Sequence, residues 1–139
     1  MPTIRKEILI EASPEQVWDA VRDVGAVHRR LVPRYTEDTR MNGHERTLTM
    51  LGGNVVREYI VSVDDQARRM AYAVVESQTP LLHHHASFQV FPHEDGVAKL
   101  VWTTDFLPDG LAAEIQARVD RGSQVMKAAI EAEAKGSVR

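Results

Sequence analysis

The chain has no cysteine, no long hydrophobic run and no excess of positive charge. Without cysteine it forms no disulfide and carries out no thiol chemistry, which fits a reducing cytoplasm. No apolar stretch approaches the roughly 20 residues of a membrane-spanning helix, and the first residues turn polar where a signal peptide needs an apolar segment. The net charge of −3 argues against a nucleic-acid-binding protein, which usually has a basic face. We therefore expect a cytoplasmic protein without stable membrane insertion.

Several catalytic motifs are also missing from the sequence. It contains no nucleophile elbow, no P-loop, no dinucleotide-binding glycine motif and no His-Glu-x-x-His motif. It has no internal repeat, linker or low-complexity tract. Its 139 residues, 43% of them hydrophobic and 27% charged, are typical of one soluble domain that is long enough to bury a core. We expect a single domain over residues 1–139 that uses no cofactor.

The beginning of the chain predicts a strand followed by a capped helix. Residues 3–11 form the strand-like segment. Ser13 fits the helix N-cap, Pro14 fits the first helical position, and Gln16 fits the capping-box position. Apolar residues recur at helical spacing after this cap. A second short helix is expected at about residues 26–31.

The middle of the chain alternates turn signals with short strand-like segments. Asn42-Gly43 is typical of a two-residue hairpin turn, and Glu94-Asp95-Gly96 indicates another turn. These segments leave no room for helical crossovers, so the sheet should be antiparallel. The expected strands after the first are residues 34–41, 44–51, 54–64, 68–76, 83–91 and 97–107.

One amphipathic helix is expected from Asp109 to about Lys135, with its apolar positions three and four residues apart. Gly122 lies in the middle of that apolar stripe, where a glycine costs about 1 kcal/mol relative to alanine. Close approach of the helix to the sheet would explain it, and so would space for a ligand. A tolerated glycine without a role is the third interpretation. The first strand should pair with the last, because the sheet must curl back to cover this helix.

The order and spacing of these segments resemble the START-like, or Bet v 1-like (SRPBCC), superfamily over nearly the whole chain. The bacterial polyketide cyclase/dehydrase and lipid-transport group is the most similar. The matching segments are Ile10–Asp19, Arg57-Glu58, Val63–Asp65, Arg69–Tyr72, Ser87–Pro92 and Leu100–Pro108.

The resemblance implies an α+β helix-grip fold. In this fold a seven-stranded curved antiparallel sheet wraps around a long C-terminal helix, two short helices lie between strands 1 and 2, and an apolar pocket is enclosed. The superfamily hosts carriers, hormone receptors, cyclases and chaperone activators, so the fold alone does not assign the function.

Strand periodicity predicts which residues face this pocket. A tight turn near Gly96 would pair residue 90 with 100, 88 with 102 and 86 with 104, which places their side chains on one face. The C-terminal helix would cover that face. The expected ligand-contacting residues are Glu58, Tyr72, Val74, His84, Ala86, Phe88, Trp102, Thr104, Val119, Gly122 and Met126.

The strand over residues 54–64 permits two interpretations. Its odd positions look more like a buried set than its even positions do, and a simple turn after Val63 would also place them inside. Plant hormone receptors of the superfamily, however, have a pocket glutamate where Glu58 falls, and pocket aromatics at the positions of Tyr72 and His84. A β-bulge would reconcile the two, because one extra residue reverses the facing of the residues beyond it. We predict that Glu58 faces inward.

The run His83-His84-His85 raises the question of a metal site. Adjacent strand residues point to opposite faces, so at most two of the three could share an ion, and two ligands make a poor zinc site. We expect no bound metal. His84 lies on the side of Phe88 and could sit opposite Glu76, which would favour the protonated imidazole. Its role is then either structural hydrogen bonding or ligand contact.

Basic residues cluster within residues 28–34, at an expected pocket mouth: His28, Arg29, Arg30 and Arg34. A solvated loop is one interpretation. Attraction of an acidic ligand, or of the phosphopantetheine of an acyl carrier protein, is another.

Three functions are compatible with these features. The first is binding or transport of a small hydrophobic ligand, such as a lipid, an isoprenoid quinone or a polyketide. The second is a polyketide cyclase or dehydratase in which Glu58, Tyr72 or His84 moves protons. The third is a protein-interaction module with an incidental cavity. An acyl carrier protein is the candidate protein partner, and the chain is expected to be a monomer or a homodimer.

Overall fold

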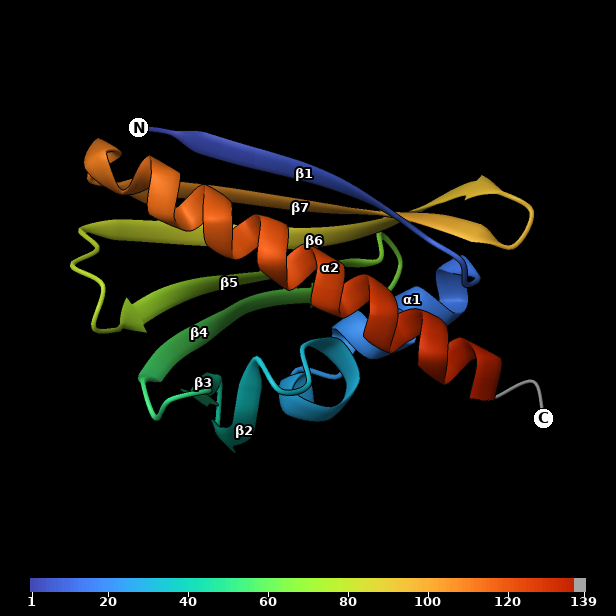
Figure 1. Cartoon of the computed structure of the whole chain (residues 1–139), viewed down its shortest axis with the longest axis horizontal. Coiled ribbons are helices and arrows are strands. Elements are labelled where there is room, and N and C mark those ends of the chain that lie inside the picture. Colours follow the sequence, from blue (N-terminus) through green and yellow to red (C-terminus); the bar gives the residue numbers. More distant parts are fainter. Residues whose placement is uncertain (137–139) are drawn as a thin grey trace.

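The structure, a computed structural model, describes residues 1–136 and consists of one curved antiparallel sheet that wraps around a long helix (Figure 1). The strand order is β1-β7-β6-β5-β4-β3-β2, so the first strand lies beside the last. This confirms the predicted helix-grip architecture. The elements are β1 (Thr3–Ile10), α1 (Pro14–Arg22), the π-helical turn η1 (Val27–Leu31), β2 (Thr36–Asn42), β3 (Glu45–Met50), β4 (Val55–Asp64), β5 (Arg69–Glu76), β6 (His83–Glu94), β7 (Val97–Leu107), the 3₁₀ turn η2 (Asp109–Leu111) and α2 (Ala112–Gly136).

The first helix begins as its sequence predicts. The hydroxyl of Ser13 accepts a hydrogen bond from the backbone N–H of Gln16, and the side chain of Gln16 accepts one from the backbone N–H of Ser13. This reciprocal pair satisfies two backbone donors that have no partner within the helix. Pro14 occupies the first turn, where its missing N–H is not needed. The cap fixes the point at which the chain leaves β1.

The register of the β6–β7 hairpin is the predicted one. Val90 pairs with Leu100, Phe88 with Trp102 and Ala86 with Thr104. Residues directly opposite each other in an antiparallel pair share a face of the sheet. These six side chains therefore lie together on the concave side, beneath α2.

One of the two interpretations of β4 is wrong. The odd residues Val61 and Val63 are exposed, whereas Glu58 and Ile60 are buried. The sheet register shifts between the pairs Ile60–Tyr72 and Ser62–Ala71, which leaves Val61 as an extra residue. This bulge reverses the facing of the strand, so a simple turn after Val63 does not place the odd positions inside. Glu58 faces inward as predicted.

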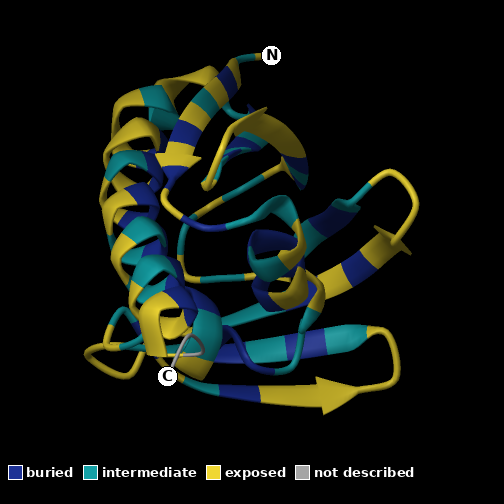
Figure 2. Cartoon of the chain, turned by 90° about the vertical axis from the view of Figure 1, so that its right-hand side faces the viewer, coloured by how far each residue is buried: buried dark blue, intermediate teal, exposed yellow. Residues whose placement is uncertain are grey.

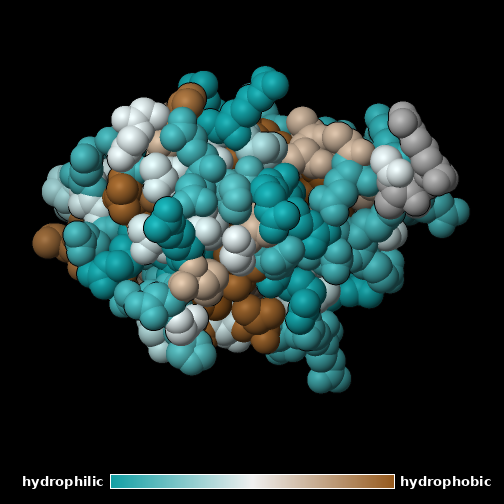
Figure 3. Space-filling model, turned by 90° about the horizontal axis from the view of Figure 1, so that it is seen from below, coloured by the Kyte–Doolittle hydropathy of each residue, from teal (hydrophilic) through white to brown (hydrophobic). Residues whose placement is uncertain are grey.

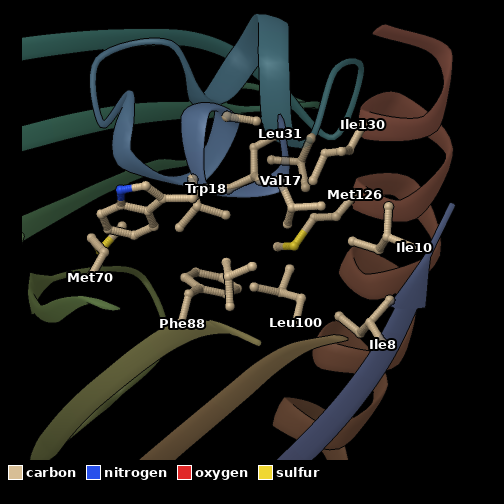
Figure 4. Close-up of a cluster of buried hydrophobic side chains, with 14 of the residues drawn as sticks. Ile8, Ile10, Val17, Trp18, Leu31, Met70, Phe88, Leu100, Met126 and Ile130 are labelled. Carbon is tan, nitrogen blue, oxygen red and sulfur yellow. The ribbon is translucent and has the colours of Figure 1, made fainter. Parts of the chain in front are cut away.

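The core lies between the concave face of the sheet and the helices. Figure 2 shows buried residues on the side of α2 that faces the sheet and exposed residues on its outer side. Figure 4 shows the larger cluster, which includes Trp18 of α1, Phe88 of β6 and Met126 of α2. A smaller cluster includes Phe106 and Ile115 near the start of α2. Trp102 packs against both clusters.

The surface combines polar regions with exposed hydrophobic side chains such as Val61 and Leu82. The face seen in Figure 3 is mostly hydrophilic, with hydrophobic side chains in small groups. In residues 1–136 no helix combines the length and the apolar character needed to cross a bilayer.

Candidate functional site

A partly open cavity of about 170 Å³ lies beneath α2, against the concave face of the sheet. Its wall contains residues of η1, of every strand from β2 to β7, and of α2. Most of the wall is aliphatic or aromatic, and Arg46, Glu58, His84 and Arg118 are its ionisable groups apart from tyrosines. The curvature of the sheet and the single helix across it therefore produce a mainly apolar chamber with a few polar positions.

All but one of the residues predicted to contact a ligand lie on the wall of this cavity. The exception is Ala86, which is 1% exposed and does not line the cavity. Its methyl group is short, and it lies in the sheet between its paired neighbours Tyr72 and Thr104. Contact of the others with a ligand stays a prediction. They are Glu58, Tyr72, Val74, His84, Phe88, Trp102, Thr104, Val119, Gly122 and Met126.

Sequence reasoning missed more than half of the wall. Ile115 lies one turn before Val119 on the predicted apolar stripe of α2, so that stripe could have identified it. Arg46, Leu48 and Met50 alternate along β3 and share a face. The period-two alternation of this strand could have identified the face. The other wall residues that were missed are Val27, Leu31, Val32, Tyr35, Thr36, Val56, Ser77, Leu81 and Arg118.

The main polar feature of the wall is a buried ion pair between Arg46 of β3 and Glu58 of β4. The two residues are direct partners across the β3–β4 ladder, with 3% and 6% of their surfaces exposed. Arg46 Nη2 and Nε donate to Glu58 Oε1 over 2.6 and 2.9 Å, and Nη1 donates to the carbonyl oxygen of Val24 over 3.3 Å. The guanidinium carbon also lies 5.3 Å from the ring centre of Tyr72. The ion pair, which joins β3 to β4, therefore also contacts Tyr72 of β5 and Val24 in the loop after α1.

Burial affects the acid–base properties of this pair. Loss of hydration raises the pKa of the Glu58 carboxyl, and the attraction and hydrogen bonds of Arg46 offset part of that rise. Burial also raises the pKa of the Tyr72 hydroxyl, and the charge of Glu58 adds to the effect. Tyr72 is therefore protonated at neutral pH.

His84 is held by two hydrogen bonds within the wall. Its Nδ1 accepts from the backbone N–H of Val74 over 3.2 Å, and its Nε2 lies 3.3 Å from the hydroxyl oxygen of Thr104. Because Nδ1 accepts, the ring proton of the neutral imidazole is on Nε2, where it can donate to Thr104. Burial is the main cause that lowers the pKa of His84 to about 4. His84 is therefore neutral at pH 7.

The predicted pairing of His84 with Glu76 is wrong. Glu76 Oε2 instead accepts from Arg57 Nη2 over 2.7 Å on the exposed side of the sheet. Glu76 lies close enough to His84 in the sequence to make a pairing plausible. In the structure its carboxylate instead pairs with Arg57 of the neighbouring strand β4.

A row of aromatic rings forms the floor of the cavity. The ring centres of Tyr72 and Phe88 are 5.9 Å apart, and those of Phe88 and Trp102 are 4.9 Å apart. Both distances lie within the range of favourable aromatic pairs. The six-membered part of the Trp102 ring extends under Gly122 of α2. The aromatic row therefore fills the space between sheet and helix at this position.

The basic cluster of residues 28–34 does not form the mouth of the cavity. None of its basic residues is part of the cavity wall. Arg30 instead joins η1 to the end of α1 and to α2 through its acidic partners Asp19, Asp23 and Glu133. The expectation of a basic mouth at these residues is wrong. The cationic group near the start of α2 is Arg118, which lines the cavity and pairs with Glu114 over 2.6 Å.

The described residues contain no group of three or more histidine, aspartate or glutamate side chains arranged to hold a metal ion. The adjacent residues His83 and His85 lie on a strand and face the side of the sheet opposite to His84.

The model of the family described as polyketide cyclase/dehydrase and lipid transport matches residues 1–138. The chain belongs to this family. The match covers the strands, the helices and the cavity wall together. No curated protein matches the chain.

Solved structures with the same fold include proteins of different activities. An uncharacterised protein from Bacillus thuringiensis has 19% identity and a TM-score of 0.84, covering 93% of this chain and 98% of its own. The Zhui aromatase/cyclase from Streptomyces sp. R1128 has 21% identity and a TM-score of 0.77, covering 99% and 96%. Norcoclaurine synthase from Thalictrum flavum has 18% identity and a TM-score of 0.73, covering 94% and 84%. At these identities the similarity establishes the fold.

Proposed function

We propose that the protein binds a small, mainly apolar ligand in the cavity beneath α2 and acts as a binding or carrier protein. The observation that carries this proposal is the cavity itself. Its wall is mostly aliphatic and aromatic, and it contains a few polar groups at fixed positions, which is the usual composition of a small-molecule site. Family membership supports the same conclusion, because the family description includes lipid transport.

The volume of the cavity limits the ligand. An engineered apolar cavity of about 150 Å³ in another protein binds benzene, so the cavity of about 170 Å³ accommodates a group of one or two rings. A whole lipid, isoprenoid quinone or polyketide exceeds this volume. We propose that only the ring or head group of such a molecule enters, while any longer chain extends through the opening.

A cyclase or dehydratase activity is the second candidate, because Glu58, Tyr72 and His84 line one cavity. The hydrogen bonds of these groups favour binding over catalysis. Both ring nitrogens of His84 are engaged by the protein, and Arg46 donates two hydrogen bonds to Glu58. A general base needs free access to the proton that it removes. We therefore rank catalysis below binding.

Adjacent residues of β5 provide a matched test. Val74 lines the cavity, whereas Val75 is 49% exposed on the opposite face. In Val74→Phe the larger side chain fills the cavity, and we expect the affinity for an apolar fluorescent probe to fall at least tenfold. Val75→Phe should bind the probe like the wild type. Equal binding by both variants would show that the probe does not enter this cavity.

Native mass spectrometry of the freshly purified protein complements this test. A bound molecule retained by the wild type and lost in Val74→Phe would support the proposal and give the mass of the ligand. Conversion of a candidate polyketide, lost in a His84→Gln variant, would instead support the cyclase.

A further inference from the structure

Only one of the two oxygens of the Glu58 carboxylate is used by the protein. Both hydrogen bonds from Arg46 go to Oε1, and Oε2 accepts none from any described residue. Within the described part of the chain, the one side-chain nitrogen or oxygen that is both unpaired and fully enclosed is Trp102 Nε1. Oε2 is therefore not fully enclosed by the protein, and Glu58 is part of the cavity wall.

An unpaired carboxylate oxygen in an otherwise apolar chamber is a strong hydrogen-bond acceptor. Glu58 is 6% exposed, so water has little access to it from outside. Buried polar atoms in proteins are nearly always satisfied, by the protein, by water or by a ligand. Oε2 is thus positioned to accept a hydrogen bond from whatever occupies the cavity.

The charges on the wall determine which donor fits. Arg46 neutralises Glu58, His84 is neutral at pH 7, and the remaining charged group is Arg118, which is paired with Glu114. A cationic amine would be repelled by Arg46 and would lose its hydration in an apolar space. A carboxylate would meet Glu58, and a ketone has no proton to donate. A neutral hydroxyl group meets the requirement.

We infer that the cavity selects a neutral one- or two-ring compound with a hydroxyl group, which donates its hydrogen bond to Glu58 Oε2. This inference rests on the proposed binding function and adds the chemical class of the ligand. The ring occupies the space above the aromatic floor of Phe88 and Trp102, and the hydroxyl group is directed toward β4.

The test compares 1-indanol with 1-indanone, which share one bicyclic skeleton and differ in whether the oxygen carries a proton. Their dissociation constants are measured by displacement of the apolar fluorescent probe. A hydrogen bond to a charged group favours the alcohol about tenfold to a hundredfold. Equal affinity for the two compounds, or preference for the ketone, overturns the inference.

Glu58→Gln reverses the polarity of the same position. The amide oxygen can continue to accept from Arg46, which leaves the amide N–H group facing the cavity. We expect the preference for 1-indanol over 1-indanone to fall at least tenfold. Glu45→Gln is the matched control, because Glu45 pairs with Arg57 outside the cavity and is absent from its wall. An unchanged preference in Glu58→Gln overturns the inference.

The wild-type comparison decides the question if Glu58→Gln, which leaves the charge of Arg46 uncompensated, does not fold. The two proposals fail in different ways. Binding of the probe and of both indane derivatives without a preference for the alcohol overturns the hydroxyl inference and leaves the binding function intact. Absence of binding of the probe and of both compounds overturns both.

Discussion

The ring of Trp102 occupies the place where a side chain at Gly122 would begin. A Cβ atom at Gly122 would lie 3.1 Å from Cζ3 and 3.2 Å from Cη2 of the indole. These contacts are closer than most contacts of real Cβ atoms, so α2 could not lie this near the sheet with a larger residue there without a shift of the ring. The glycine in the apolar stripe is explained by close approach of the helix to the sheet.

Gly122→Ala should therefore affect binding more than stability. Alanine gains about 1 kcal/mol of helix propensity, and we expect displacement of the Trp102 ring to offset most of that gain. The displaced ring enters the cavity and should reduce the affinity for the apolar probe at least threefold. Thermal unfolding and probe titration measure the two effects. Gly136→Ala, where nothing lies within 4 Å of the new methyl group, is the control and should leave probe affinity unchanged.

The ion pair of Arg46 and Glu58 should show strong coupling in a double-mutant cycle. Arg46→Met leaves a buried carboxylate without its partner and should lower the free energy of unfolding by about 3–5 kcal/mol. The double variant Arg46→Met/Glu58→Met removes both charges and should cost less than Arg46→Met alone. Chemical denaturation measures all three proteins. Additive losses would contradict a tightly coupled pair.

A surface pair provides the comparison for that cycle. Arg57 pairs with Glu45, and both side chains are more than a third exposed. We expect Arg57→Met to lower the free energy of unfolding far less than Arg46→Met does, because exposed ion pairs contribute little to stability.

The low pKa of His84 predicts a specific dependence of stability on pH. The pKa is about 4 in the folded protein, against 6.5 for an unperturbed histidine, so the unfolded chain takes up the proton first as the pH falls. Protonation then favours unfolding, and His84 should lower the free energy of unfolding by about 2 kcal/mol between pH 7 and pH 5. Burial of Glu58 acts in the opposite direction, because its raised pKa favours the folded state as the pH falls. The contribution of His84 must therefore be isolated with a variant.

His84→Gln should remove this part of the pH dependence, measured as the difference in free energy of unfolding from the wild type across pH 7 to pH 5. His83→Gln changes the exposed neighbour on the opposite face and should retain the wild-type slope. Parallel slopes for wild type and His84→Gln would show that His84 does not titrate as the structure indicates.

Arg30 should contribute to stability without affecting the cavity. It joins η1 to α1 and to the end of α2 through its three acidic partners, and its side chain is 21% exposed. Arg30→Met should lower the free energy of unfolding by about 1–2 kcal/mol and leave probe affinity unchanged. Arg29→Met, at the exposed neighbouring position, should have little effect on either quantity. A loss of probe affinity in Arg30→Met would restore a role for this cluster at the cavity.

The fold was predictable because its signals are local. The capping residues of α1, the turn signal at Gly43 and the alternation along β6 and β7 each specify geometry within a few residues. The loop itself is Gly43-His44, one position later than the predicted Asn42-Gly43, because Asn42 pairs with Glu45. The register of the β6–β7 hairpin then follows from the turn at Gly96 together with a bulge between Pro92 and Glu94, which the sequence did not reveal. The antiparallel topology was predictable because the connections between the strands are too short to contain helical crossovers.

The polar part of the site was less predictable because it depends on long-range pairing. Arg46 has the appearance of a solvated residue in the sequence, and only its ladder partner Glu58 explains its burial. The facing of Glu58 itself depends on a bulge, which alternation cannot reveal. The partners of His84 are a backbone N–H and a hydroxyl rather than the acid that its charge suggested. Burial and register, which are set by the whole sheet, decide these contacts.

The pairing of β1 with β7 has a consequence for synthesis of the protein. Ribosomes deliver the N-terminal strand first, yet residues 3 and 10 find their hydrogen-bond partners only at residues 105 and 98. Until then the nascent sheet has an open edge, and its concave apolar face stays uncovered until α2 emerges. Such contacts between distant segments slow folding and expose aggregation-prone surface. The ligand chamber is thus complete only once β7 and α2 are available, so its assembly depends on the last third of the chain.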